Sequence, residues 1–173
     1  MFKVLKFRFC IGLFCLAAIP FTKAQQLSPL KNKVYYSVED ALTENLQARQ
    51  LNLRDQELLH IPNNVELLEQ LQFLNLMRND ITFCSEALFN LSNLETLNLK
   101  LNGITVLPDN IGNLKKLIHL NISANKLKSL PNTIGNLKDL KVLYLSLNAL
   151  TTLPTSIGQC KNLTDLDLQN NHI

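Results

Sequence analysis

Nine side chains suited to binding another protein recur at matching positions of a 23-residue period in this chain. They combine aromatic and aliphatic groups, which are stabilised by burial, with amides that donate and accept hydrogen bonds. An apolar patch beside polar groups is typical of a protein-binding surface. The candidate partner-binding residues are therefore Phe73, Met77, Asn98, Leu101, His119, Asn121, Val142, Tyr144 and Leu147.

No arrangement for catalysis or metal binding accompanies these side chains in the sequence. His119 has no cysteine, glutamate or second histidine at the matching positions of other repeats, and His60 and His172 fall in expected turns. The chain also lacks a nucleophile–base–acid spacing and a glycine-rich loop that could hold phosphate. We therefore predict a protein that is not an enzyme and has no catalytic residue, metal site or cofactor.

The period that aligns the candidate residues comes from the repeat Leu-x-x-Leu-x-Leu-x-x-Asn-x-Leu. A fixed period in the twenties is the sequence signature of a solenoid, in which each unit packs only against its neighbours. Six copies, with no insertion between them and the last one incomplete, begin at Ala48, Leu71, Leu94, Leu117, Leu140 and Leu163.

The fourth repeat, residues 117–139, shows how one unit forms a coil. Leu120, Asn121 and Ile122 alternate apolar and polar side chains, which predicts a half-buried strand. Asn125 follows at the turn, where its amide can satisfy backbone groups and bond to copies in neighbouring coils. Pro131 then directs the chain out of the sheet, because proline cannot donate a ladder hydrogen bond.

Positions three, five, seven and eight of each unit are expected to face solvent from one side of the sheet, and the candidate residues occupy these positions. At position five we expect a polar ladder with donors and acceptors on each rung, beside the apolar patch. The asparagines of this ladder are Asn52, Asn75, Asn98 and Asn121.

Three segments with the sequence Leu-Pro-x-x-Ile-Gly, at residues 107–112, 130–135 and 153–158, resemble the leucine-rich repeat family. The 23-residue type is similar to repeats of Ras-group proteins and of bacterial exported proteins. The resemblance implies an α/β fold, a curved leucine-rich repeat solenoid with a parallel β-sheet on its concave face. The second repeat departs from the motif at Cys84 and Ser85, and we expect a helical turn over residues 86–89 there.

The chain divides into three predicted segments: an export signal (1–24), a lead-in with an N-terminal capping helix (25–47) and the repeat domain (48–173). The signal has a basic start followed by an apolar stretch over residues 9–19, which is too short to span a bilayer as an ordinary helix. We expect Gln25 to be the first mature residue and no stable membrane span after cleavage. The alternative is an uncleaved membrane anchor.

The short capping helix is predicted over residues 38–47, because Ser37 and Asp40 have the spacing of a helix start. We expect it to cover the open end of the first coil. Residues 25–36 are expected to form a loose lead-in, with Tyr35 and Tyr36 either packed on the cap or exposed.

The charge of the mature chain argues against nucleic acid as a partner. Four of the 17 Lys and Arg residues precede Gln25, whereas none of the 14 Asp and Glu residues does, so the mature charge is 13 minus 14, or −1. Nothing in this balance of charges suggests a broad basic face for nucleic acid.

The two cysteines that follow the signal, Cys84 and Cys160, are interpreted as small buried core residues. They lie three coils apart, roughly 14 Å at about 4.8 Å per strand, which exceeds the limit of about 7 Å for a disulfide. Glycosylation sequons occur at Asn90, Asn121 and Asn162; a glycan on Asn121 would conflict with binding on the concave face.

The sixth repeat stops at Ile173 without a polar cap, whereas solenoids need capped ends for solubility. We expect either a fragment of a longer chain or a strand edge that another chain covers. Self-association through this C-terminal edge is one form of the second expectation.

The function that we predict is a non-enzymatic module that binds a protein partner on its concave sheet. The expected location is periplasmic, at the cell surface or secreted, in a bacterium. Two alternatives remain at this stage: the recognition arm of a larger enzyme or signalling protein that continues past residue 173, and an intracellular scaffold like the Ras-group proteins.

The export signal can be tested by N-terminal sequencing of the protein recovered from its producing cell. We expect the first residue to be Gln25, because signal peptidase cleaves after a small residue such as Ala24. A protein that still begins at Met1 would contradict export and favour the intracellular scaffold.

Overall fold

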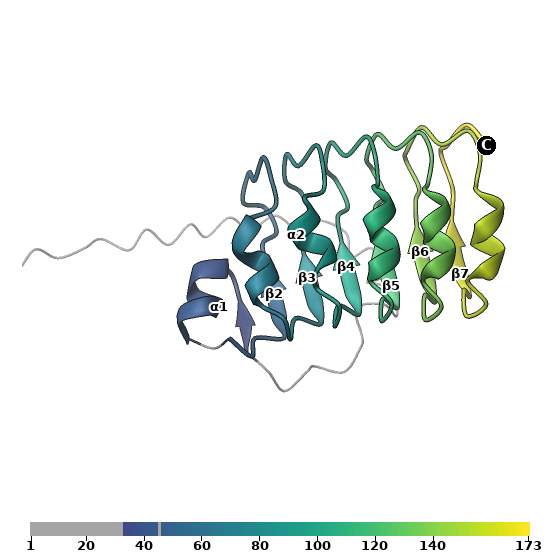
Figure 1. The fold of residues 1–173 in the computed structure, drawn as a ribbon. Coiled ribbons are helices and arrows are strands. Elements are labelled where there is room, and N and C mark those ends of the chain that lie inside the picture. Colours follow the sequence, from purple (N-terminus) through teal and green to yellow (C-terminus); the bar gives the residue numbers. More distant parts are fainter. Residues whose placement is uncertain (1–32, 45) are drawn as a thin grey trace, which may run out of the picture.

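The computed structural model describes residues 33–44 and 46–173. The predicted export signal, including Cys10 and Cys15, and the lead-in up to residue 32 lie outside the described residues. The described chain forms a stack of coils, each with a strand on one side and, in most coils, a short helical segment on the other (Figure 1). This arrangement is the curved α/β solenoid that the repeat predicted.

The strands form one parallel sheet whose order follows the sequence from β1 to β7. Consecutive repeat strands pair 23 residues apart, so that Gln50 lies opposite Phe73 and Phe73 lies opposite Thr96. Equal positions of neighbouring repeats are therefore direct neighbours in space. The strands are β1 (Val34–Tyr35), β2 (Gln50–Asn52), β3 (Phe73–Asn75), β4 (Thr96–Asn98), β5 (His119–Asn121), β6 (Val142–Tyr144) and β7 (Asp165–Asp167).

The outer side of the stack consists mainly of single turns of 3-10 helix, each of which starts directly after a proline. Proline has a fixed φ and no backbone N–H, so it suits the start of a helix and cannot continue the sheet. The second coil has an α-helix after Ser85 instead, which confirms the helical turn expected there. The elements are η2 (Asn63–Leu67), α2 (Glu86–Phe89), η3 (Asp109–Asn113), η4 (Asn132–Asn136) and η5 (Thr155–Gln159).

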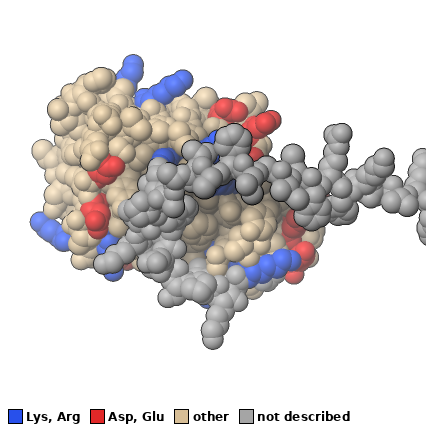
Figure 2. Space-filling model, turned by 180° about the vertical axis from the view of Figure 1, so that it is seen from behind, with Lys and Arg blue, Asp and Glu red and all other residues tan. Residues whose placement is uncertain are grey.

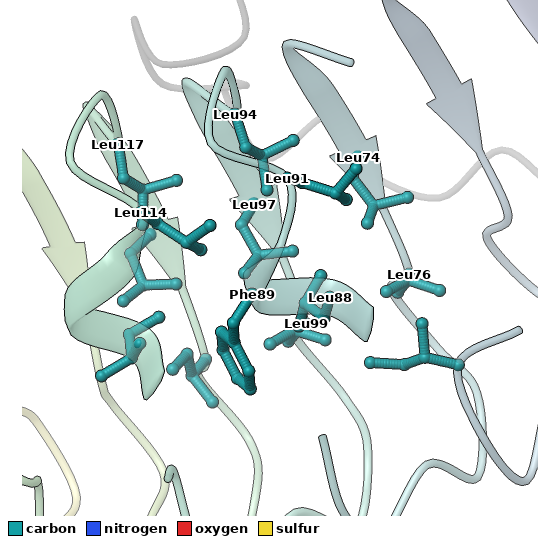
Figure 3. Packing of buried hydrophobic residues seen from close by; sticks show 14 of the residues in the cluster. Leu74, Leu76, Leu88, Phe89, Leu91, Leu94, Leu97, Leu99, Leu114 and Leu117 are labelled. Carbon is teal, nitrogen blue, oxygen red and sulfur yellow. The ribbon is translucent and has the colours of Figure 1, made fainter. Parts of the chain in front are cut away.

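The core is a continuous column of aliphatic side chains between the sheet and the outer turns. Leu74, Leu97 and Leu120, from three consecutive strands, are completely buried. Figure 3 shows Phe89 of α2 pointing between leucines of adjacent coils. Because burial of such a side chain contributes about 1.5–3 kcal/mol and depends on both neighbours, one coil is not stable alone.

Five asparagines at the turn after each strand tie consecutive coils together. In Asn125, Nδ2 donates to the carbonyl of Leu99 in the preceding coil at 2.9 Å and to that of Ile122 in its own coil at 3.1 Å. Its Oδ1 accepts the backbone N–H of Ile104 at 3.0 Å. We call this row the turn asparagines: Asn79, Asn102, Asn125, Asn148 and Asn171.

The turn asparagines correct one expectation from the sequence. Their amides satisfy backbone groups as predicted, but the bonds to the neighbouring coil end on its backbone and not on the next asparagine. The distance between coils explains this, because the amide of Asn148 already reaches the carbonyl of Ile122 at 2.9 Å. The backbone of one coil therefore depends on a side chain of the next.

Two glycines of the Leu-Pro-x-x-Ile-Gly motif, Gly112 and Gly135, are required by the close approach of neighbouring outer turns, whereas a Cβ on Gly158 would meet no atom within 4 Å. A Cβ on Gly135 would lie 2.5 Å from the backbone oxygen of Ser156, and one on Gly112 would lie 2.9 Å from that of Thr133. Side-chain atoms are not tolerated at such distances. The motif therefore reflects packing on the outer side and not an anion-binding loop.

The N-terminal end differs from the expected loose lead-in. Val34 and Tyr35 form strand β1, which pairs with Gln50 and Leu51 of β2, and Tyr35 is buried whereas Tyr36 is exposed. The helix α1 (Val38–Glu44) begins at the predicted residue and ends three residues early. The run of β-branched and aromatic residues favours a strand, which covers the edge of β2.

We predict that Asn125→Asp strongly destabilises the protein. The new carboxylate oxygen would face the carbonyls of Leu99 and Ile122 instead of donating to them, and the loss of satisfied buried groups costs about 2–5 kcal/mol. Urea unfolding followed by circular dichroism measures this free energy. The control Asn113→Asp changes an exposed asparagine on the outer side and should cost under about 0.5 kcal/mol; equal losses in both variants would refute the role of Asn125.

Candidate protein-binding surface

The structure places the nine predicted residues on four consecutive coils, along the sheet and the turns that follow it. Asn98, Asn121 and Tyr144 lie opposite one another on β4, β5 and β6. His119 lies opposite Val142 one row away. We call the row that contains Asn121, the row that contains His119, and the second and third positions after each strand (positions seven and eight of the repeat) the concave surface.

Position eight lies three residues after each strand and is a bend or turn, which corrects the expectation that it is part of the strand. Every repeat has a left-handed backbone there, with φ of 58° at both Leu101 and Leu147. Leucine rarely adopts this conformation, because its Cβ approaches the following carbonyl oxygen. Both leucines are nevertheless exposed, Leu101 at 41% and Leu147 at 54%, so their side chains project away from the core.

The strand asparagines offer only half of the hydrogen-bonding capacity that the sequence predicted. Their side-chain oxygens accept the backbone N–H two residues further on, at 3.1 Å from Lys100 to Asn98 and at 3.0 Å from Ser123 to Asn121. The oxygen of Asn75 is used in the same way. The ladder therefore presents the amide N–H donors of Asn98 and Asn121, because their side-chain oxygens already accept backbone N–H groups.

Two positions are less accessible than their place on the sheet predicted. Val142 is only 9% exposed although it lies outside the main core cluster, and Ser123 is 4% exposed. Ser146 donates to the Ser123 hydroxyl at 3.2 Å. Phe73, Met77 and Tyr144 are half-buried, so their rings or sulfur remain open to contact.

His119 has an unpaired ring nitrogen and a lowered pKa. Burial of the ring is the main cause that lowers its pKa, the positive charge of Lys141 lowers it further, and Asp165 acts in the opposite direction. Its Nδ1 is shielded from solvent and has no hydrogen-bond partner among the described residues. The imidazole is therefore neutral at pH 7 and adds a polar but uncharged group to the surface.

The structure adds residues that the repeat pattern did not identify. Val34 of β1 lies opposite Gln50 and so extends one row of the surface by a coil, and Tyr36 beside it is 63% exposed. Because β1 has no repeat motif, only its β-branched and aromatic composition could have indicated it. At the same end, Asp55 forms ion pairs with Arg54 at 2.7 Å and with Arg78 at 3.1 Å.

The remaining reactive groups do not form a second site. Cys84 and Cys160 are free thiols. Cys160 is buried as predicted, whereas the residue Cys84 as a whole is only partly buried. Burial raises the pKa of the Cys84 thiol to about 12. Among the described residues, no three metal-ligating side chains are grouped, and no helix has the length and apolar character to span a bilayer.

Figure 2 shows the molecule from behind, the side of the sheet, and the visible part of this face is mainly uncharged. Acidic groups (red) appear toward both ends of this view, and basic groups (blue) lie near them. A largely neutral surface with charges toward its ends is suited to contact with protein side chains.

The chain belongs to the leucine-rich repeat family: the family model for a leucine-rich repeat region matches residues 83–172. A leucine-rich repeat protein of Leptospira interrogans is similar, with 41% identity and a TM-score of 0.76, over 80% of this chain and 36% of that chain. No curated protein matches the chain significantly.

Two further solved structures are similar over 80% of this chain and 20% of theirs. One is the leucine-rich repeat ectodomain of the Arabidopsis thaliana membrane receptor kinase GASSHO1/SCHENGEN3 in complex with CASPARIAN STRIP INTEGRITY FACTOR 2 (26% identity, TM-score 0.65). The other is a TLR13–ssRNA13 complex (29% identity, TM-score 0.68). The chain thus spans about a third or less of the length of these proteins. Leucine-rich repeat folds typically serve as non-enzymatic protein-binding modules.

The environment of His119 predicts how neighbouring substitutions change its titration. Lys141→Ala should raise the pKa of His119, and Asp165→Ala should lower it further, as measured by NMR of the ring proton. Because the pKa of the folded state is depressed, this residue's contribution to stability is present above pH 6.5 and is lost as the pH falls toward the folded-state value. A His119 pKa at or above 6.5 would contradict the structure.

Proposed function

We propose that this protein is an exported, non-enzymatic binding module that holds a segment of a protein partner against its concave surface. The observation that carries the proposal is the pair of exposed leucines, Leu101 and Leu147, in left-handed turns on either side of the coil that contains His119. Tyr144 on β6 is half-buried in the row of Asn98 and Asn121 and supplies an aromatic anchor.

The choice of leucine at these turns is unfavourable for folding. The fold requires a positive φ at this position in every repeat, which Asn170 and Asp55 tolerate better than a large aliphatic residue does. Leu101 and Leu147 also leave much of their apolar surface in water. Since neither property stabilises the monomer, contact with a partner is a better explanation for these side chains.

The free amide groups indicate what the partner offers in return. With their oxygens bonded to backbone N–H groups, Asn98 and Asn121 can donate but have little capacity to accept. A polypeptide segment presents a carbonyl acceptor at every residue, so it can use such donors whatever its sequence. Side chains that fit against Tyr144 and the two leucines then supply specificity.

A protein partner is favoured over nucleic acid, although the fold class includes a neighbour solved with single-stranded RNA. Binding of a phosphate backbone needs several cations along the bound strand. The last strand of the sheet instead carries Asp165 and Asp167, which would repel phosphates. We therefore retain the prediction that nucleic acid is not the partner.

Rigid presentation is the mechanism that we propose. The strands and turns that carry the surface are bonded to both neighbouring coils, so a partner does not have to order them. Association then avoids the loop-ordering cost that flexible binding sites incur. This favours binding that is fast and limited by the partner's own flexibility.

Export to the periplasm, the cell surface or the medium is part of the proposal. It rests on the sequence of residues 1–24, and it agrees with the extracellular ectodomain among the structural neighbours. A recognition arm of a larger protein is the second candidate, because the chain spans only 36% of the Leptospira protein. Self-association at β7 stays a prediction, for which the 42% exposure of Leu166 offers a contact.

The proposal predicts that Phe73→Ala combined with Tyr144→Ala weakens binding and leaves the fold intact. The probe is the set of peptides that a random phage-displayed library yields on the wild-type protein, with affinity measured by fluorescence anisotropy. Removal of two aromatic anchors should weaken these peptides at least about tenfold.

The matched control is Phe83→Ala with Val106→Ala, which removes two exposed apolar side chains that lie outside the concave surface. It should change the affinities less than about twofold. If the control weakens binding as much as the aromatic variant, or if neither does, binding on the concave surface is refuted.

A further inference from the structure

Charged residues on the concave surface are sorted by sign along the stack of coils. Three cations lie on the first three coils, two or three residues after each strand: Arg54, Arg78 and Lys100. The central strands β5 and β6 carry no Asp, Glu, Lys or Arg. The last strand, β7, has the sequence Asp-Leu-Asp.

The cationic end has more positive charge than its own acid can neutralise. Asp55 is the shared partner of both arginines, at 2.7 Å from Nε of Arg54 and 3.1 Å from Nε of Arg78. Lys100 has no ion-pair partner among the described residues. Three cations face one carboxylate, and the arginine of each pair keeps further donors free for a ligand.

Charges at the start of the strands do not cancel this polarity. In the residues that precede the strands, Arg49 on the first coil is offset by Glu95 on the third. Lys141 precedes β6 and acts on His119 near the middle of the surface. The excess of positive charge therefore remains on the first three coils.

The acidic end is accessible, and no cation among the described residues forms an ion pair with its carboxylates. Asp165 is exposed and accepts a hydrogen bond from Thr164 at 2.8 Å, while Asp167 is partly exposed and accepts the backbone N–H of Gln169 at 3.0 Å. Neither carboxylate has an ion-pair partner among residues 33–44 and 46–173. By register they continue the rows of Val142 and Tyr144.

We infer that the partner segment is dipolar: it places an acidic side chain at Arg78 and Lys100, an apolar side chain at Tyr144 and the two leucines, and a basic side chain at Asp165 and Asp167. This inference rests on the proposed function, because it assigns the chemistry of the segment bound there. The opposite charges fix which way the segment lies across the strands.

The spacing of coils sets the spacing of charges in the partner. Asp165 lies three coils from Lys100 and four from Arg78, which is about 14–19 Å at roughly 4.8 Å per strand. An extended peptide that crosses the strands rises about 3.3 Å per residue. Its acidic and basic side chains should therefore be about four to six residues apart, with the apolar residue between them.

The test selects a random phage-displayed peptide library on the full chain and on the charge-swap variant Arg78→Glu/Lys100→Glu. Peptides enriched on the wild type should have Asp or Glu separated from Lys or Arg by about four to six residues. On the variant the acidic residues should disappear. Wild-type affinities should also fall as salt rises from 50 to 500 mM, since exposed charges are screened.

The matched control Lys115→Glu/Lys128→Glu makes the same change in net charge at exposed positions outside the concave surface. Peptides enriched on this control variant should show the same separation of acidic and basic residues as peptides enriched on the wild type. If the peptides enriched on this control also lose their acidic residues, the inference is refuted, because the change in net charge alone would then explain the selection. Circular dichroism of both variants confirms that they are folded.

The two levels of the proposal fail in different ways. Peptides that need Tyr144 but show no charge pattern, or that carry only acidic residues, would overturn the dipolar segment and leave concave binding in place. Peptides that bind the Phe73→Ala/Tyr144→Ala variant as well as the wild type would overturn concave binding itself, and the dipolar segment with it.

Discussion

The bond between a turn asparagine and the backbone of the neighbouring coil is the constraint on which the rest of this structure depends. As one example, the side chain of Asn125 donates to carbonyls of two coils and accepts the N–H of Ile104. Burial of the leucines supplies most of the stabilising free energy, but the hydrophobic effect has no direction. The asparagines add direction, because an unsatisfied buried carbonyl or N–H costs about 1–3 kcal/mol, so only one register between coils is stable.

The same constraint determines where variation is tolerated and hence where binding can develop. Substitution of the buried leucines or the turn asparagines should destabilise the stack, whereas exposed side chains on the concave surface contribute little to it. The backbone beside each asparagine has a left-handed residue in every coil, which explains why Leu101 and Leu147 project outward. The result is a rigid row of turns that holds apolar groups next to the amide donors of Asn98 and Asn121. A surface of this kind separates recognition from folding.

Much of the fold could be predicted because the repeat reports it six times. The strand at His119–Asn121, the buried leucines around it and the helical turn at Glu86–Phe89 each follow from local pattern. The candidate site was less predictable. The burial of Val142 and the use of the Asn121 oxygen by the N–H of Ser123 depend on contacts between atoms, and a position in a repeat gives only the direction of a side chain. Strand β1 was missed because it has no repeat motif.

The sequence by itself determined the architecture, since a period of 23 with leucines and an asparagine at constant positions is compatible only with stacked coils in register. Only the tertiary structure decided the chemistry of the concave surface. It showed that the strand asparagines are donors, that Asp55 is shared by Arg54 and Arg78, and that Asp165 and Asp167 stand at the opposite end. The physical reason is that periodicity records interactions repeated in every coil, whereas hydrogen bonds and charge pairs between particular side chains occur once and depend on their distances.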